Sequence, residues 1–261
     1  MFFSIIVPCF NSEAYIEETI NSLLSQTYHN YEIIVIDGAS TDSTLDILQK
    51  HGNSICVYSE PDGGMYDAIN KGILRAKGDI ISYLNSDDLY HPDTLLSIVQ
   101  YLKKTPLAVA DFLLYSDLHI VDQNTRLIRT HYYPHHDLNT FLLSNHSLIG
   151  QPASFWARSL HYKHHIWFDT NLRMAADYKF YIQARLSGIS FIKLTNALAY
   201  YRVHSSSLTS TLQSINKKEL ETIKADFPTC HSALSLTNYI RTLIFYYSMN
   251  FSRKLIRHLF Q

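Results

Sequence analysis

The chain has 261 residues, of which 46% are hydrophobic, and a formal net charge of −1 at pH 7. This length fits one large domain, or one domain with an extension, and the near-neutral charge excludes a general basic surface for nucleic acid. We expect a cytoplasmic protein, because no apolar run reaches the roughly 18 residues that span a bilayer and no basic start precedes the first apolar run. The 19 tyrosines and 14 histidines suit either a sugar-binding cleft or a membrane-facing surface.

Short apolar segments alternate with amphipathic ones over the first hundred residues. The expected strands are 4–7, 32–36, 55–59 and 80–84, and the expected helices begin after Asn11 or Ser12, after 40–43, at Tyr66 and at Pro92. Such alternation predicts a mainly parallel sheet with helices on both faces. Because crossovers between parallel strands are right-handed, the polar clusters that end the four strands meet at one edge, where open α/β sheets bind their ligands.

The most informative of these clusters follows the fourth strand. Asn85, Ser86, Asp87 and Asp88 stand directly after a buried apolar run. Charged groups there are costly to desolvate, so they do not serve stability, but their oxygens are suited to holding a divalent cation against a phosphate. The chain has neither the glycine fingerprint of dinucleotide-binding folds nor a P-loop, which disfavours a nicotinamide enzyme and a P-loop ATPase.

The pattern changes after Pro106. A hairpin is expected from strands 112–118 and 126–130, followed by a helix over 137–144, a strand over 151–156, a helix over 175–186 and strands over 189–193 and 197–203. We interpret residues 1–208 as one domain, with a nucleotide-binding half to about 105 and an acceptor half beyond it. Residues 209–261 form a helical extension in this interpretation.

Cysteine and histidine spacing gives little support to a structural metal. The three cysteines, Cys9, Cys56 and Cys230, lie far apart, and small buried thiols in a reducing compartment are favoured over a disulfide or zinc. Five histidines could suggest a zinc site: His131, His135, His136, His164 and His165. Zinc is disfavoured there, because adjacent histidines on one segment rarely converge on one ion.

Four motifs at matching intervals carry a family resemblance. They are SIIVPCFNSE at 4–13, IVIDGASTD at 34–42, EPDGGMYDAINKG at 60–72 and the NSDD cluster at 85–88, with Ala-Asp-Tyr following at 176–178. The chain resembles the family-2 glycosyltransferases of the GT-A fold over residues 4–204, in a form common among bacterial cell-surface polysaccharide enzymes. The resemblance implies a nucleotide-sugar donor and a glycan or lipid-linked glycan acceptor.

The resemblance also assigns donor-binding residues. Asp37 matches a position that accepts a ring N–H such as uracil offers, which favours a UDP-sugar, while GDP- and dTDP-sugars stay open. The full implied set is Pro8, Asn11, Glu13, Asp37 and Ser40 around the nucleotide, and Asp67, Asn70, Lys71, Asn85 and Ser86 toward the diphosphate and sugar.

A divalent cation, Mn²⁺ or Mg²⁺, is implied at the end of the fourth strand. Asp87 matches the metal-holding carboxylate of the Asp-x-Asp motif, with Asp88 beside it, and His204 matches a histidine that completes the metal shell in some relatives. Asn85 departs from the motif, because an aspartate is common there, and an amide oxygen without charge predicts weaker metal binding. A surface histidine at a strand end explains His204 equally well.

Asp177 matches the catalytic base of inverting members, which removes the proton of the acceptor hydroxyl. Its alternative role is to cap the helix that starts beside it; the resemblance favours the base. Gln151 and Trp156 either face the acceptor or belong to an ordinary strand, and the ordinary strand is the simpler explanation.

The end of the chain, residues 236–261, is apolar and finishes with a basic cluster. It fits a helix on the cytoplasmic face of the inner membrane, or a helix docked on the domain. These observations together predict an inverting glycosyltransferase of cell-surface polysaccharide synthesis. The alternatives are a non-catalytic nucleotide-sugar-binding protein of the same fold and, with less support, a nucleotidyltransferase.

Overall fold

The computed structural model describes residues 1–105, 111–135, 148–227, 240, 241, 244 and 248. Within them, one set of strands is β1 (Phe3–Cys9), β2 (Tyr31–Asp37), β3 (Cys56–Ser59), β4 (Ile80–Tyr83), β6 (Phe112–Tyr115), β9 (Ser154–Ala157) and β10 (Ser190–Lys193). A second set is β5 (Leu89–Tyr90), β7 (Leu118–Val121), β8 (Leu127–His131) and β11 (Ala199–Arg202). The helices are α1 (Ile16–Leu24), α2 (Thr44–Gln49), α3 (Met65–Arg75), α4 (Thr94–Lys104), α6 (Ser159–Tyr162), α7 (Ala176–Leu186), α8 (Leu208–Thr211) and α9 (Gln213–Asp226), with short 3₁₀ turns η1 (Gly52–Ser54) and η2 (Gln151–Ala153).

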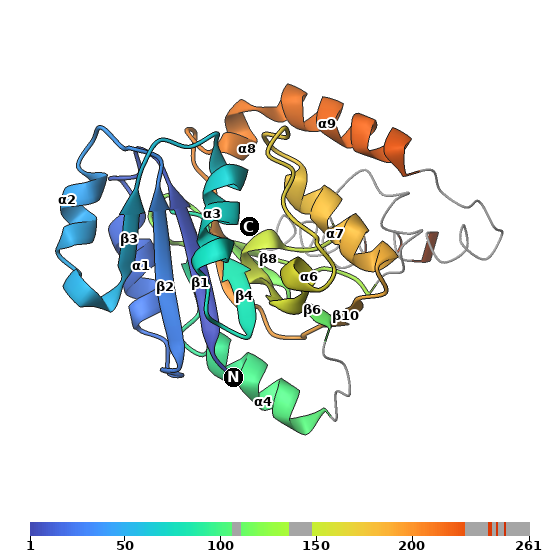
Figure 1. The fold of residues 1–261 in the computed structure, drawn as a ribbon. Helices are drawn as coiled ribbons and strands as arrows, with labels where there is room; N and C mark the ends of the chain where they lie inside the picture. The colour runs from blue at the N-terminus through green and yellow to red at the C-terminus, as the bar shows by residue number, and fades with distance from the viewer. Residues whose placement is uncertain (106–110, 136–147, 228–239, 242–243, 245–247, 249–261) are drawn as a thin grey trace, which may run out of the picture.

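The first set forms a sheet in the order β10-β6-β9-β4-β1-β2-β3, and the second forms a sheet in the order β5-β11-β7-β8. In the larger sheet β4, β1, β2 and β3 run parallel, whereas β9 lies antiparallel between β4 and β6. In Figure 1 helix α3 lies in front of this sheet and α1 behind it. The predicted mixed, mainly parallel sheet flanked by helices is therefore confirmed.

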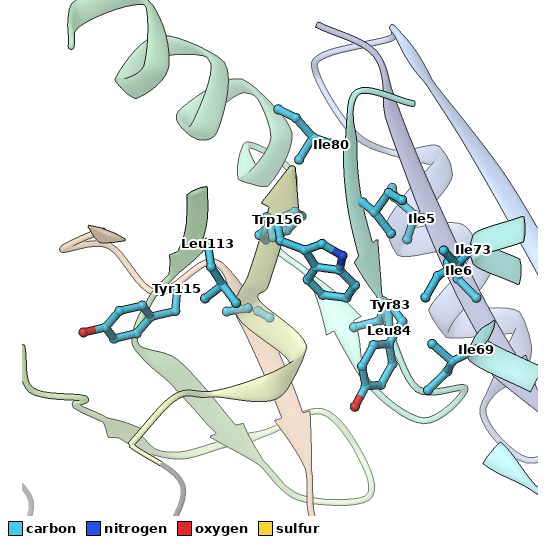
Figure 2. Packing of buried hydrophobic residues seen from close by; sticks show 14 of the residues in the cluster. Ile5, Ile6, Ile69, Ile73, Ile80, Tyr83, Leu84, Leu113, Tyr115 and Trp156 are labelled. Atoms are coloured by element: carbon cyan, nitrogen blue, oxygen red, sulfur yellow. The ribbon is translucent and has the colours of Figure 1, made fainter. Parts of the chain in front are cut away.

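Apolar side chains on both faces of β1 explain why this strand is central. All its residues are buried, and Ile6 packs against Ile69 and Ile73 of α3 (Figure 2). On the same face of the sheet as Ile6, Trp156 of β9 packs beside Tyr83 of β4, and both rings are buried. The Trp156 indole Nε1 donates to Nε2 of the buried His161 at 2.7 Å, so its polar atom is satisfied inside the core.

The second half differs from the prediction at residues 112–118, which do not form one strand. The chain forms β6, breaks at Ser116 and Asp117, and continues as β7 in the other sheet. The Ser116 hydroxyl donates to the Asp117 carbonyl, and the Asp117 carboxylate pairs with Lys193 at 2.9 Å. The predicted turn at 122–125 is correct, but it joins β7 to β8.

Four smaller expectations also need correction. Residues 151–153 form η2 before β9 begins, and α4 begins at Thr94, two residues after Pro92. Helix α1 begins at Ile16 with Tyr15 as its N-cap residue, whereas Asn11 has a left-handed conformation with φ 49° and its side-chain oxygen accepts the Thr41 backbone N–H at 2.9 Å. Cys56 is exposed on the edge strand β3, although Cys9 is buried as expected. The expected helix at 137–144 and Cys230 lie outside the described residues.

Candidate functional site

A cavity of about 1160 Å³ opens at the carboxyl ends of β1 and β4 and extends to the smaller sheet. The start of α3, the start of α7 and the helices α8 and α9 form its other walls. This is the sheet edge at which the sequence places the polar clusters. The predicted site residues that line the cavity are Pro8, Asn11, Asn85, Ser86, Asp87, Asp177 and His204.

Asp37, at the end of β2, does not line the cavity but holds the loops beside it. Asp37 is fully buried, and its carboxylate accepts the Ser40 hydroxyl at 2.5 Å and the Ser59 hydroxyl at 2.7 Å. The same Ser40 oxygen accepts the backbone N–H of Asn11 at 2.8 Å. Glu13 accepts the backbone N–H of Ser43 at 2.9 Å. These contacts fix the loops after β1 and β2 to each other, and the predicted contacts of Asp37, Ser40 and Glu13 with a nucleotide stay predictions.

The three donor-binding candidates on α3 lie away from the cavity wall. Asp67 accepts the backbone N–H of Gly63 at 2.9 Å and lies 3.3 Å from Lys71 Nζ. Asn70 exchanges two hydrogen bonds with the backbone of Phe168, at 2.8 and 3.2 Å. Their side chains thus hold the start of α3 and join it to the loop before α7. Contacts of Asp67, Asn70 and Lys71 with a diphosphate also stay predictions.

A chain of amides fixes the orientation of Asn85. The Tyr83 carbonyl only accepts, so Gln151 presents its Nε2 there, at 3.0 Å, and its Oε1 accepts Asn85 Nδ2 at 3.2 Å. The Asn85 Oδ1 is consequently turned away from these partners. It is buried and has no hydrogen-bond partner among the described residues, and Asn85 lies on the cavity wall. An acceptor in this situation needs a ligand or solvent.

Asp87 and His204 meet beside this amide. His204 Nε2 lies 2.9 Å from Asp87 Oδ2, and the histidine Nδ1 lies 2.9 Å from the Ser206 hydroxyl. The ring of Tyr15 packs against the imidazole, with 4.7 Å between centroids. The loop at the end of β11 thus reaches the end of β4 from the other sheet.

Asp88, the third metal-ligand candidate, points away from the cavity. It is fully buried, and it accepts the Arg202 backbone N–H at 2.9 Å and Asn85 Nδ2 at 3.4 Å. Burial, followed by the neighbouring charge of Asp87, raises the pKa of Asp88 well above its usual range. Its role as a ligand stays a prediction.

Among the described residues, no three His, Cys, Asp or Glu side chains gather into a metal site. The residues present still fit a divalent cation, because the unpartnered Asn85 Oδ1, a carboxylate oxygen of Asp87 and His204 Nε2 lie at one corner of the cavity wall. Two oxygens and an imidazole suit Mn²⁺ better than Mg²⁺. The diphosphate of a donor would supply further ligands.

Arg202 and Asp62 belong to the site but are absent from the predicted set. The Arg202 side chain is fully buried and donates to the Asp87 carbonyl at 2.8 Å and to Glu18 at 2.6 Å. A charged residue inside the apolar strand β11, two positions before His204, is the signal that could have identified it. Asp62 lines the cavity and accepts the Gly64 backbone N–H at 2.8 Å. The signal for Asp62 was its place in the polar cluster after the third strand and in the motif at 60–72.

Asp177 lies at the start of α7, as predicted, and faces the cavity. Its Oδ1 accepts the Tyr178 backbone N–H at 2.8 Å and lies 3.5 Å from the Tyr66 hydroxyl. The N-cap residue, Ala175, makes no side-chain hydrogen bond to the helix, so Asp177 is not the N-cap, although its carboxylate does accept one amide of the first turn. Burial raises the pKa of Asp177 to about 6, against the opposing effect of the Tyr178 hydrogen bond. A carboxylate with this pKa is a stronger base than an exposed one and is still ionised at neutral pH.

Comparisons with known proteins agree with this geometry. The model of the family Glycosyl transferase family 2 matches residues 4–165. The chain belongs to this family. An uncharacterized glycosyltransferase of Rickettsia typhi is 33% identical over 215 residues, which cover 80% of this chain and 66% of that protein. The hyaluronan synthase of Pasteurella multocida is 30% identical over 224 residues, 82% of this chain and 22% of that enzyme. The chain thus spans just under two thirds of the length of the first relative and about a fifth of the length of the second.

Solved structures confirm the GT-A fold of this family-2 glycosyltransferase. The S. aureus TarS fragment 1–349 in complex with UDP-GlcNAc aligns with a TM-score of 0.68 at 24% identity, over 95% of this chain and 73% of that one. The mannosyltransferase PcManGT from Pyrobaculum calidifontis, in complex with GDP-Man and Mn²⁺, aligns with a TM-score of 0.61 at 17% identity, over 94% and 69%. At these identities the likeness concerns the fold alone.

The C-terminal part of the described chain contributes to the cavity through Leu208 of α8, Leu212 between the two helices, and Asn216 and Leu220 of α9. No helix among the described residues is long and apolar enough to cross a bilayer. Most of the expected membrane-binding segment, 236–261, lies outside the described residues, so its contact with a membrane stays a prediction.

Proposed function

We propose that this protein is an inverting glycosyltransferase that moves a sugar from a nucleotide donor, preferably a UDP-sugar, to a hydroxyl of a glycan or lipid-linked glycan. One observation carries the proposal: Asp177, Asn85 and Asp87 all line one cavity at the sheet edge. This arrangement offers a base for the acceptor and polar groups for the diphosphate of the donor. The relation to hyaluronan synthase supports a role in polysaccharide synthesis.

The reaction is a single displacement. Asp177 accepts the proton of the acceptor hydroxyl while that oxygen attacks the anomeric carbon, and the bond from this carbon to the diphosphate oxygen breaks. The nucleoside diphosphate leaves with the bonding electron pair, and the anomeric configuration inverts. Asn85, Asp87 and His204 would hold Mn²⁺, which neutralises charge on the departing diphosphate when bound.

Burial of Asp177 serves this step in two ways. The raised pKa strengthens its basicity, and the nearby phenol of Tyr66 limits the orientations of the carboxylate. Tyr66 is held in turn, because its hydroxyl donates to the Met174 carbonyl at 2.9 Å. The base is therefore oriented before an acceptor arrives.

The test combines binding with turnover. Thermal shifts are measured with UDP-GlcNAc, GDP-mannose and dTDP-glucose, each with and without Mn²⁺, and sugar transfer is assayed with any donor that stabilises the protein. We expect Asp177→Asn to keep the donor-induced shift and to lose about 10²–10⁴-fold in transfer rate, and Asp87→Ala to lose the Mn²⁺-dependent part of the shift. The proposal fails if no nucleotide sugar stabilises the protein or if Asp177→Asn transfers sugar at the wild-type rate. Pyrophosphate release from a nucleoside triphosphate would instead indicate a nucleotidyltransferase.

A further inference from the structure

Helix α9 carries a carboxylate that binds the loop leading into α7, and Figure 1 shows α9 lying across the start of α7. Glu219 Oε1 accepts the backbone N–H of Arg173 at 2.8 Å. Its Oε2 accepts the N–H groups of Met174 and Ala175 at 2.9 and 3.0 Å. One side chain thus satisfies three consecutive amides. Because these amides precede the first helical turn, they have no carbonyl partner within α7.

The bound loop ends two residues before Asp177. It is held from the opposite side as well, since the Tyr66 hydroxyl of α3 donates to the Met174 carbonyl. The segment that presents Asp177 to the cavity is therefore fixed between α3 and α9. We propose that Glu219 is a positioning residue for Asp177, which fixes the loop 173–175 and thereby the direction in which Asp177 faces the cavity. This inference rests on the proposed function, in which Asp177 is the base.

The charge of Glu219 has a second consequence. The amino end of a helix stabilises an ionised carboxylate, so α7 by itself would make Asp177 a weaker base. A second carboxylate at the same helix end opposes this effect, and Glu219 does raise the pKa of Asp177, after the larger contribution of burial. Other titratable groups near Asp177 include the phenols of Tyr66, Tyr83, Tyr178, Tyr181 and Tyr201, whose pKa values are all raised by burial. They stay neutral at physiological pH, so Glu219 is the charged neighbour in this set.

The positioning role is tested without any ligand. Hydrogen exchange of the peptide containing amides 173–175 is compared for wild type, Glu219→Ala, Glu219→Gln and Glu221→Gln. Glu221 is the matched control, because it stands on the same helix and is exposed. Exchange of these amides should rise about tenfold or more in Glu219→Ala, which corresponds to about 1.4 kcal/mol of lost protection. Glu219→Gln should show a smaller rise, because an amide oxygen still accepts, and Glu221→Gln should match wild type. Unchanged exchange in Glu219→Ala overturns the proposal, and unchanged exchange of β1 shows that the fold is intact.

The charge effect is read from the titration of Asp177. Carboxyl carbon NMR, assigned through Asp177→Asn, should show a lower pKa for Asp177 in Glu219→Gln than in wild type. With a donor that binds, Glu219→Ala should lower kcat and leave the donor KM unchanged, with rescue in Glu219→Gln. An unshifted Asp177 titration contradicts the charge effect, and a change confined to KM contradicts the positioning role. Absence of any donor-induced thermal shift would instead count against the proposed function, and the exchange result would still decide whether Glu219 holds the loop.

Discussion

Replacement of Arg202 by methionine is expected to lower the free energy of unfolding by about 2 kcal/mol. The guanidinium is buried, and beyond Glu18 and the Asp87 carbonyl it also donates to the Gln123 carbonyl at 2.9 Å and to the Thr125 hydroxyl at 3.1 Å. Glu18 is half exposed and returns to water in the variant. Gln123 is exposed too, so its carbonyl also returns to water, whereas the half-buried Asp87 carbonyl loses its donor, and an unsatisfied buried acceptor costs about 1–3 kcal/mol. Methionine retains most of the apolar stem, so lost packing adds little.

The assay is urea unfolding at pH 7, with the midpoint and slope fitted for wild type and variants. Arg126→Met is the matched control, because Arg126 is exposed in the turn between β7 and β8, and its effect should stay within about 0.5 kcal/mol. A loss below about 1 kcal/mol in Arg202→Met would refute the reasoning that this side chain joins the two sheets through the Asp87 carbonyl. Because Arg202 also holds the backbone of Asp87, the variant should bind a nucleotide sugar with less dependence on Mn²⁺.

Two further predictions concern pH. The rate of sugar transfer should fall about tenfold per unit below pH 6, because Asp177, with a pKa raised to about 6, accepts a proton only when ionised; a rate that stays constant down to pH 4.5 would exclude Asp177 as the base. Burial lowers the pKa of His161 to about 4. Between pH 6.5 and pH 4 the imidazole therefore binds a proton in the unfolded chain but not in the folded one. The stability that the neutral His161 provides is present above pH 6.5 and is lost as pH falls through this range. The unfolding free energy of wild type relative to His161→Gln should therefore drop by about 2 kcal/mol from pH 7 to pH 5 in urea titrations, and a constant difference would contradict a neutral buried imidazole.

The first half of the fold was predictable because local and global signals agree there. Strands β1, β2 and β4 are runs of β-branched and aliphatic residues bounded by polar turns, and their observed limits lie within two residues of the expected ones. The change of sheet between β6 and β7 was not predictable. The run from Phe112 to Val121 contains only Ser116, Asp117 and His119 as polar residues, and the ion pair that holds Asp117 comes from Lys193, far along the chain.

The location of the site followed from the sequence, but the direction of each side chain did not. Asp37 and Asp87 both end strands, yet hydroxyl groups enclose Asp37 below the rim, while Asp87 faces the cavity. Asp87 faces the cavity, whereas the adjacent Asp88 points into the protein, because its carboxylate accepts the Arg202 backbone N–H. Ser40 is only three residues from Asp37, but the other partners, such as Ser59 for Asp37 and Arg202 for Asp87 and Asp88, lie 22 to 115 residues away, and no local pattern contains them.

These long-range partners also show that the cavity draws on residues from both sides of the predicted boundaries at 105 and 208. The expected nucleotide-binding half, 1–105, supplies Asn85 and Asp87, but His204 and Arg202, which complete and hold that corner, come from β11. The expected extension after 208 supplies Glu219, which binds the loop before Asp177, and Leu220 of the cavity wall. Each half of the proposed chemistry, release of the diphosphate and activation of the acceptor, thus depends on residues beyond 200. A binding site distributed in this way closes only after the whole described chain has folded, so we regard the predicted boundaries at 105 and 208 as divisions of sequence pattern and the cavity as one functional unit.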